Sequence, residues 1–153
     1  MLAQQNFLQN RPGALLWQSA QQNIANAAWT GTNFDNAIRD NYSGHSNSVN
    51  PSRYTCQVPG VYSVKGGGGW ATAAGGTGRG ASIYKNGAIY TSGGSAVVGN
   101  SGVAHVTPVG TDVIMAIGDY IELFVWQNTG GSLLTSGVGQ YSSYLAINWE
   151  SFT

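Results

Sequence analysis

The stretch RYTCQVPGVYSVKGGGGW (residues 53–70) decides the fold class of this chain. Large and polar side chains alternate over residues 53–58, which is the pattern of a half-buried antiparallel strand. The Pro-Gly pair at 59–60 is a turn dipeptide, and the alternation resumes after it. The second run then passes into four consecutive glycines followed by Trp70. The stretch therefore predicts two strands, the second of which ends in backbone with almost no side chains.

The same period of two continues on both sides of this stretch. The sequence ASIYKNGAIY (81–90) predicts a hairpin, because Asn86 and Gly87 tolerate the positive φ angles of a two-residue turn. No segment after residue 12 keeps helical spacing over three turns. Many short strands separated by turn signals are typical of an antiparallel sandwich or barrel, so the predicted class is all-β. Further alternating segments are ALLWQ (14–18), AAWTGTNF (27–34), YIELFVWQN (120–128) and YSSYLAINWE (141–150).

The length and the N-terminal composition predict a single domain with an arm. A chain of 153 residues fits one domain and buries roughly 70% of its unfolded surface when it folds. Residues 1–12 are rich in Gln and Asn, and the chain breaks at the Arg-Pro-Gly sequence of 11–13. We expect residues 1–12 to form an N-terminal arm and residues 13–153 to form the β domain.

The composition argues against two classes of partner. Only 8% of the residues are charged, against about 25% in an average globular protein. The basic residues form no run, so nucleic-acid binding is not expected. No apolar segment approaches the roughly 20 residues that cross a bilayer, and the first residues lack the basic and apolar regions of a signal peptide. We therefore expect the protein to be made and assembled in a cytoplasm. The basic residues are Arg11, Arg39, Arg53, Lys65, Arg79 and Lys85.

The stock of catalytic groups is small, and we expect neither an enzyme nor a resident cofactor. The chain has six carboxylates, two histidines and one thiol, and they show no metal-ligand spacing or nucleophile motif. The sequence GGTGRG (75–80) lacks the Lys and Ser/Thr of a phosphate-binding loop. Cys56 has no partner for an internal disulfide. Its place between two large side chains predicts a buried, inert thiol rather than a nucleophile.

The segment at 120–127 is apolar on both faces, which predicts an oligomer. A strand that is apolar on both faces is covered on both faces. In a two-layer sandwich the second cover must come from another subunit, and most soluble oligomers close with point symmetry. One face carries Ile121, Leu123 and Val125, and the other carries Tyr120, Phe124 and Trp126.

Several motifs in order resemble a known family. The elements VPGVYSV (58–64), IYKNG (83–87) and GDYIEL (118–123) look like the jelly-roll domain of the complement component 1q globular head and the tumour necrosis factor superfamily. More closely, the segment at 30–64 is similar to a version of that domain found in tailed bacteriophages and bacteria. The matching motifs are W-T-x-x-x-F-D at 29–35, GHS at 44–46 and NPSRYT at 50–55.

The resemblance covers nearly the whole chain, from Ala14 to Trp149, and implies a ten-stranded jelly roll that assembles as a trimer. The chain departs from the family in two places: it has no Gly-X-Y collagen stalk, and YLAINWE (144–150) differs from the complement pattern. Some relatives hold Ca²⁺, which makes Asp35, Asp40 and Asp112 conceivable ligands. Oxygen-rich loops are far more often ordinary turns, so no metal is predicted.

In such a trimer one sheet of each protomer faces the three-fold axis, where side chains meet their own copies. Apolar, aromatic and small residues suit that position. Glycines at 66–69 permit a close approach of backbone or of a partner's aromatic ring, or else they form a bulged strand end. Both readings stay open from the sequence. The predicted interface residues are Trp70, Tyr120, Phe124, Trp126 and Tyr144.

The resemblance and the composition together predict a structural protein of a tailed bacteriophage virion. The expected form is a trimeric knob on the tail or baseplate, docked by residues 1–12, that contacts a host surface glycan or protein. One alternative is a decoration protein on a local three-fold of the capsid. A second alternative is a free bacterial lectin-like module, and fold alone does not choose among the three. Candidate ligand-binding loop residues are Tyr42, His45, Asn47, Arg79 and Asn100.

Overall fold

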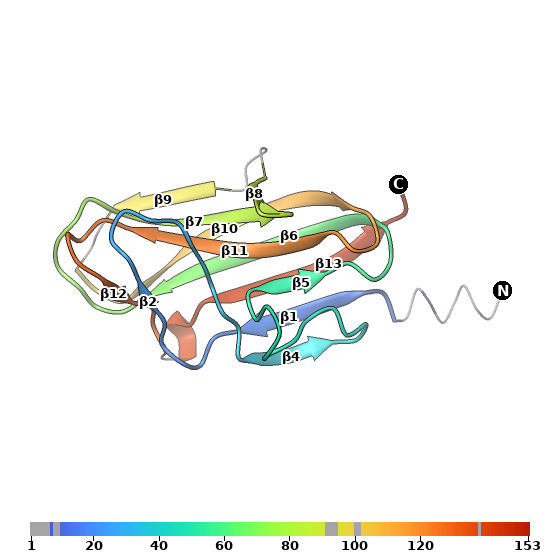
Figure 1. Ribbon diagram of the computed structural model, residues 1–153, viewed down its shortest axis with the longest axis horizontal. Helices are drawn as coiled ribbons and strands as arrows, with labels where there is room; N and C mark the ends of the chain where they lie inside the picture. Colours follow the sequence, from blue (N-terminus) through green and yellow to red (C-terminus); the bar gives the residue numbers. More distant parts are fainter. Residues whose placement is uncertain (1–6, 8–9, 91–94, 100–101, 138) are drawn as a thin grey trace.

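The computed structural model describes residue 7 and residues 10–90, 95–99, 102–137 and 139–153 (Figure 1). Most of the predicted arm at 1–12 and the candidate residue Asn100 lie outside the described residues. Within the described ranges, no helix is long and apolar enough to span a membrane.

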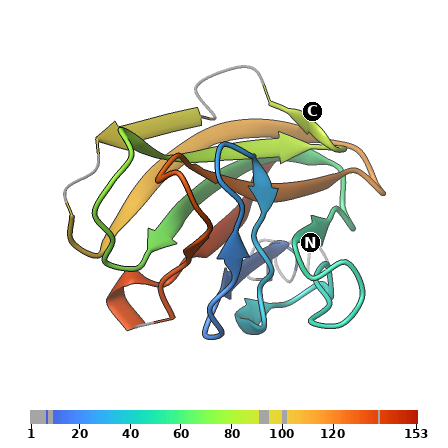
Figure 2. The same ribbon diagram turned by 60° about the vertical axis from the view of Figure 1, so that its left-hand side comes forward.

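The chain forms an antiparallel β-sandwich, which confirms the predicted fold class (Figures 1 and 2). One sheet has five strands in the order β10-β6-β13-β1-β4. These strands are β10 (His105–Met115), β6 (Gly60–Trp70), β13 (Tyr144–Ser151), β1 (Gly13–Trp17) and β4 (Asn36–Asp40).

The second sheet of the sandwich has six strands, with β11 at its centre. Its main path is β3-β11-β7-β8, while β5 pairs with β11 and β9 pairs with β7. A small ribbon of two strands, β12 and β2, is separate from both sheets. The strands of the second sheet are β3 (Thr30–Gly31), β5 (Arg53–Thr55), β7 (Gly78–Lys85), β8 (Ala88–Ile89), β9 (Ser95–Gly99) and β11 (Tyr120–Gln127). The ribbon is β2 (Asn23–Ile24) with β12 (Leu133–Leu134), and one 3₁₀ turn spans Gly139–Tyr141.

The core lies between the inward faces of the two sheets. Alternation along β11 turns Ile121, Leu123 and Val125 inward, where they are fully buried. They meet the inward side chains of β6 and β13 from the facing sheet. The one-sided burial of these strands is the pattern expected of a two-layer sandwich. Other fully buried core residues are Ala14, Leu16, Phe34, Tyr54, Tyr62, Val64, Ile83, Val113, Leu145 and Ile147.

The four glycines form the end of strand β6 and pair with β10 in an unbroken register, so the prediction of a bulged end is wrong. A methyl group on Gly66 would lie 3.0 Å from Leu123 Cδ1, and one on Gly68 would lie 2.7 Å from Val125 Cγ1. Gly69 lies directly against the backbone of residues 141–143. The prediction of a close approach is therefore confirmed, but the approaching atoms belong to the same chain.

The ring of Tyr144 lies over Gly67 on the other side of the sheet, at a distance that leaves no room for a side chain at residue 67. Tyr144 and Gly67 are cross-strand partners in β13 and β6. Glycine is therefore needed on both faces of this strand end. The inward glycines admit the facing sheet, and the outward ones admit a ring and a backbone segment.

The described N-terminal residues and the C-terminus lie at one end of the sandwich (Figure 1). The Phe7 ring lies 5.0 Å from that of Trp149 and 5.5 Å from that of Phe152. The Trp149 amide donates to the Pro12 carbonyl at 2.9 Å. Loops that connect β6 to β7 and β11 to β12 lie at the opposite end, which comes forward in Figure 2.

Candidate interaction surfaces

The outer face of the six-stranded sheet carries the three aromatic residues of β11 that were predicted at the interface. The Phe124 ring stacks on Tyr84 with centroids 3.8 Å apart. The Arg53 guanidinium lies 3.9 Å from the centre of the Tyr120 ring. The Trp126 ring lies 6.4 Å from that of Trp29. Each of the three is half-buried by its own chain, so part of this face is covered without a second subunit. Their place in an interface stays a prediction.

The charged side chains on that side of the molecule pair with one another. Arg53 Nε lies 3.4 Å from Glu122 Oε1, and Ser52 Oγ donates to the same oxygen at 2.6 Å. Lys85 Nζ lies 2.8 Å from Asp119 Oδ2. The hydrogen bond from Lys85, with further bonds from the Asn86 side chain and the Ala116 amide, lowers the pKa of Asp119 to about 2. This side of the sandwich is therefore electrostatically self-contained.

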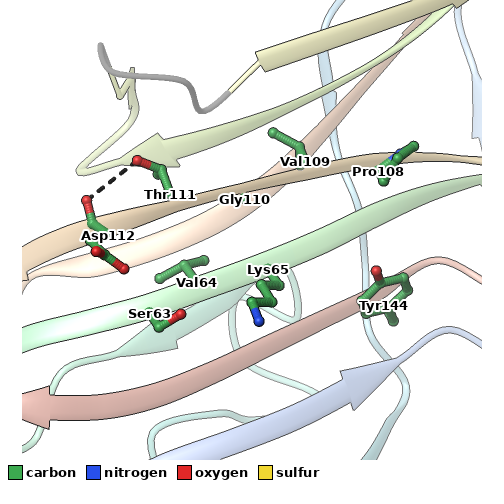
Figure 3. A pocket seen from close by; sticks show the side chains of 9 residues that line it. All are labelled: Ser63, Val64, Lys65, Pro108, Val109, Gly110, Thr111, Asp112 and Tyr144. Carbon is green, nitrogen blue, oxygen red and sulfur yellow. Dashed lines mark hydrogen bonds between the residues drawn. The ribbon is translucent and has the colours of Figure 1, made fainter.

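The outer face of the five-stranded sheet contains an open groove of about 550 Å³, here called the sheet groove (Figure 3). The ring of Tyr144 borders it at one end, and Asp112 borders it at the other (Figure 3). Lys65 and Asp112 both line this groove, yet they form no ion pair within the described chain. The other residues that line the groove are Ser63, Val64, Pro108, Val109, Gly110 and Thr111.

A second hollow, here called the arginine pocket, has a volume of about 480 Å³ and lies where β4, β1 and β13 meet the N-terminal segment. Arg39 Nη2 donates to the Asn148 side-chain oxygen at 2.5 Å and more weakly to the Ile147 carbonyl at 3.4 Å. No ion pair of Arg39 or Arg11 occurs within the described residues. The lining residues are Asn10, Arg11, Pro12, Arg39, Asn41, Asn148, Trp149 and Glu150.

The wall of the arginine pocket is fixed by asparagine side chains. The Gly13 amide donates to Asn41 Oδ1 at 2.9 Å. Asn41 Nδ2 in turn donates to the Arg11 carbonyl at 2.7 Å and to the Asn10 side-chain oxygen at 2.8 Å. These bonds hold the chain before β1 against the end of β4, so the pocket is preformed in the single chain.

Two predicted surface residues lie in the interior, and for them the prediction is wrong. Trp70 is fully buried and Arg79 is 1% exposed. Strand β6 continues to Trp70, and its alternation turns that ring inward. Arg79 also points inward from β7, where its guanidinium donates to the carbonyls of Gly78 and Gly75 at 2.9 and 3.3 Å. Burial lowers the pKa of Arg79. Neither side chain is placed to touch a partner.

The candidate loop residues around His45 serve mainly to brace their own loop. One ring nitrogen of His45 lies 2.8 Å from the Arg53 carbonyl, and the other lies 3.2 Å from the Phe34 carbonyl. The Asp40 carboxylate accepts the backbone N–H groups of Gly44 and His45, both at 2.9 Å. A hollow of about 300 Å³ adjoins this loop. Tyr42 is half-buried and Asn47 is exposed, so Asn47 is the loop candidate that is free to meet a ligand.

The structure does not bring the conceivable calcium ligands together. Asp40 is occupied by the backbone bonds just described, and Asp35 accepts bonds from the Ser19 amide and hydroxyl and the Ala20 amide. Asp112 lies in β10, at the opposite edge of the five-stranded sheet from β4. Among the described residues, no three His, Cys, Asp or Glu side chains are grouped to hold a metal ion.

Cys56 is buried, as predicted, with an exposed fraction of 1%. Its thiol donates to the Val58 carbonyl at 3.1 Å, and burial raises its pKa. A buried thiol with a raised pKa is a poor nucleophile. Cys56 is therefore not placed to act as a nucleophile.

Comparison with known proteins identifies the fold class. No family model and no curated protein matches the chain, whereas 152 chains of solved structures do. The globular domain of zebrafish complement 1qA aligns with 94% of this chain and 100% of its own, at 14% identity and a TM-score of 0.60. Murine APRIL at pH 8.0 aligns with 90% of this chain and 98% of its own, at 10% identity and a TM-score of 0.62.

A third structural neighbour is the Eiger TNF of S. frugiperda, which aligns with 94% of this chain and 96% of its own, at 12% identity and a TM-score of 0.64. The chain therefore has the jelly-roll fold of complement 1q and tumour necrosis factor domains, as the motifs indicated. Domains of this fold are typically non-catalytic and usually trimerise. At these identities the likeness concerns the fold alone.

Proposed function

We propose that this protein is a structural subunit of a tailed-bacteriophage virion, a trimeric jelly-roll knob on the tail or baseplate that contacts the host surface. The fold supports the trimer, because domains of this type usually trimerise. The motifs at 29–55, which resemble the bacteriophage version of the domain, support the virion. A chain with 8% charged residues and no described catalytic group fits a structural role.

The main support for a trimer is the character of the outer face of the five-stranded sheet. This face combines the sheet groove with apolar side chains that are half-buried or exposed, and Ile114 is 58% exposed. Its charged residues lack ion-pair partners within the described chain, whereas those beside the six-stranded sheet are paired. We therefore assign the subunit contact to this face. Its apolar residues are Leu15, Trp17, Val61, Pro108, Ile114, Tyr144 and Ala146.

The ends of the sandwich suggest how a knob is oriented. Asn41, at the start of the His45 loop, bonds to residues 10 and 11, so that loop begins at the same end as the termini. In the proposed knob the N-terminal arm docks on the particle, and loops at the remote end face the host. The loop at 71–77 lies at that end, and its residues Gly75 and Gly76 are exposed. Host contact is therefore assigned to this loop rather than to Asn47.

Immunogold electron microscopy of virions with antibodies against the purified chain tests the proposed location. Label at the tail tip or baseplate is the expected result. Label at the three-fold positions of the capsid would contradict the tail knob and favour the capsid decoration protein. Virions without label, together with a glycan-array signal from the isolated protein, would contradict a virion component and favour the lectin-like module.

A further inference from the structure

The charged side chains divide sharply between the two sides of the sandwich. All twelve lie within the described residues. The two ion pairs both flank the six-stranded sheet, and the carboxylates of Asp35 and Asp40 accept backbone N–H groups. Buried Arg79 bonds to carbonyls. Five side chains remain without an ion pair in the described chain, and all belong to the five-stranded side: Arg11, Arg39, Lys65, Asp112 and Glu150.

Two of these unpaired groups lie at the same height on opposite edges of that sheet. Asp112 of edge strand β10 pairs with Ser63, and Ser63 pairs with Asn148. Asn148 pairs with Gly13 and also accepts the hydrogen bond from Arg39 of the other edge strand, β4. Strands are about 4.8 Å apart, so the backbones of Asp112 and Asn148 are about 10 Å apart. The carboxylate and the guanidinium therefore share one row across the sheet without pairing in the chain.

A ring of copies brings these two edges together. In a cyclic assembly each subunit contacts the next through two different patches, and a rotation about the axis keeps every atom at its height. When the axis runs along the strands, the β10 edge of one copy reaches the five-stranded face of the next at an unchanged height. Asp112 at the β10 edge of one copy then lies near the arginine pocket of the next copy, which contains Arg11 and Arg39.

We propose that Asp112 of one copy occupies the arginine pocket of the neighbouring copy and pairs there with Arg39, with Arg11 beside it. The partner is thus a second copy of this chain, and the inference rests on the proposed trimer. A carboxylate accepts two parallel N–H bonds from a guanidinium, which fixes orientation as well as adding attraction. The pocket walls are already held by the hydrogen bond between the Gly13 amide and Asn41. Little further conformational entropy is therefore lost when the neighbouring copy binds.

Charge reversal in the full-length chain tests this pairing. Trimer dissociation is measured by sedimentation equilibrium for the wild type, Asp112→Arg, Arg39→Glu and the double variant. Each single reversal places like charges in contact, and we expect it to raise the dissociation constant about tenfold or more. The double variant restores an opposite pair, and we expect it to return to within about threefold of the wild type.

Two controls separate this contact from a general effect of charge. Lys65→Glu alters a cation of the sheet groove that is not the proposed partner, so Asp112→Arg is not expected to rescue it. Asn47→Asp adds a charge to an exposed loop and should leave the trimer unchanged. Circular dichroism checks that each variant is folded.

The outcomes distinguish this inference from the proposed function. The Asp112–Arg39 pairing is overturned if the wild type is a trimer and neither single reversal raises its dissociation constant. It is also overturned if the double variant dissociates more readily than either single variant. Both results leave the proposed trimer intact. Rescue of Lys65→Glu by Asp112→Arg overturns it as well. A wild type that is monomeric refutes the proposed trimer itself.

Discussion

Gly69 illustrates how a single residue of this fold is determined by what lies against it. Its amide donates to Ser143 Oγ at 2.9 Å, and its carbonyl accepts the Ser136 amide at 3.0 Å. A methyl group at this position would meet the Tyr141 carbonyl oxygen and would lie 2.7 Å from the Ser143 nitrogen. Because both obstacles are backbone atoms, no rotamer change relieves the contact.

Gly69→Ala is therefore expected to lower the free energy of unfolding by about 3 kcal/mol, as overpacking against rigid neighbours does. The matched control is Gly99→Ala, since Gly99 also lies in a strand but has nothing within 4 Å of the added methyl group. Urea denaturation of the two variants measures the difference. Equal stabilities would show that residues 141–143 do not pack on β6 as described.

Asp119 makes the free energy of unfolding depend on pH in the acid range. Its folded pKa, about 2, is below the ordinary value of 3.8. The stabilisation is therefore complete above pH 4 and is lost as the pH falls toward 2. The side chain is 20% exposed, so solvent screens part of the effect and we expect a loss of about 1–2 kcal/mol.

Asp119→Asn should remove this part of the acid sensitivity. The free energy of unfolding of wild type and variant is compared at pH 6 and pH 2.5 by urea denaturation. The difference in free energy of unfolding between wild type and variant should become smaller as the pH falls. A difference that stays constant would mean that the Asp119 carboxylate is not ionised and hydrogen-bonded in the folded protein.

At the scale of the strand, alternation predicted which side chains point inward but not what covers the outward ones. The inward face of β11 is as expected. Its outward rings contact Arg53, Tyr84 and Trp29, which are distant in sequence, and a local pattern carries no information about them. Trp70 was misplaced for a related reason: glycines have no side chain to show the alternation, so the end of β6 was not recognised.

Tyr144 lies on the outer face of the five-stranded sheet and the β11 aromatics lie on that of the six-stranded sheet, so a pair of variants separates the two faces. Tyr144→Ser removes a ring beside the sheet groove, and we expect the trimer dissociation constant to rise about tenfold. Trp126→Ser removes a ring from the six-stranded face, and we expect the melting temperature to fall with the trimer retained. Analytical ultracentrifugation and thermal melts measure both. The reverse pattern would return the interface to the β11 aromatics.

At the scale of the whole molecule, the composition and the motif order were sufficient for the fold class and suggested an oligomer. They did not indicate which face assembles, because that depends on how charges from distant strands are distributed. Arg53 and Glu122 are 69 residues apart in sequence and neutralise each other, whereas the Arg39 guanidinium reaches the row of Asp112 through Asn148 without contacting Asp112. Which charged residues are paired and which are not becomes visible only when the strand register is known.

The central claim is that the chain functions as a trimer, and its mass in solution tests this most directly. Size-exclusion chromatography with multi-angle light scattering, at micromolar concentration, should give a mass three times that of the 16.0 kDa chain. We expect that mass to persist on dilution and to decrease at high salt, which screens the proposed ion pairs. A single 16.0 kDa species at every concentration would contradict the account.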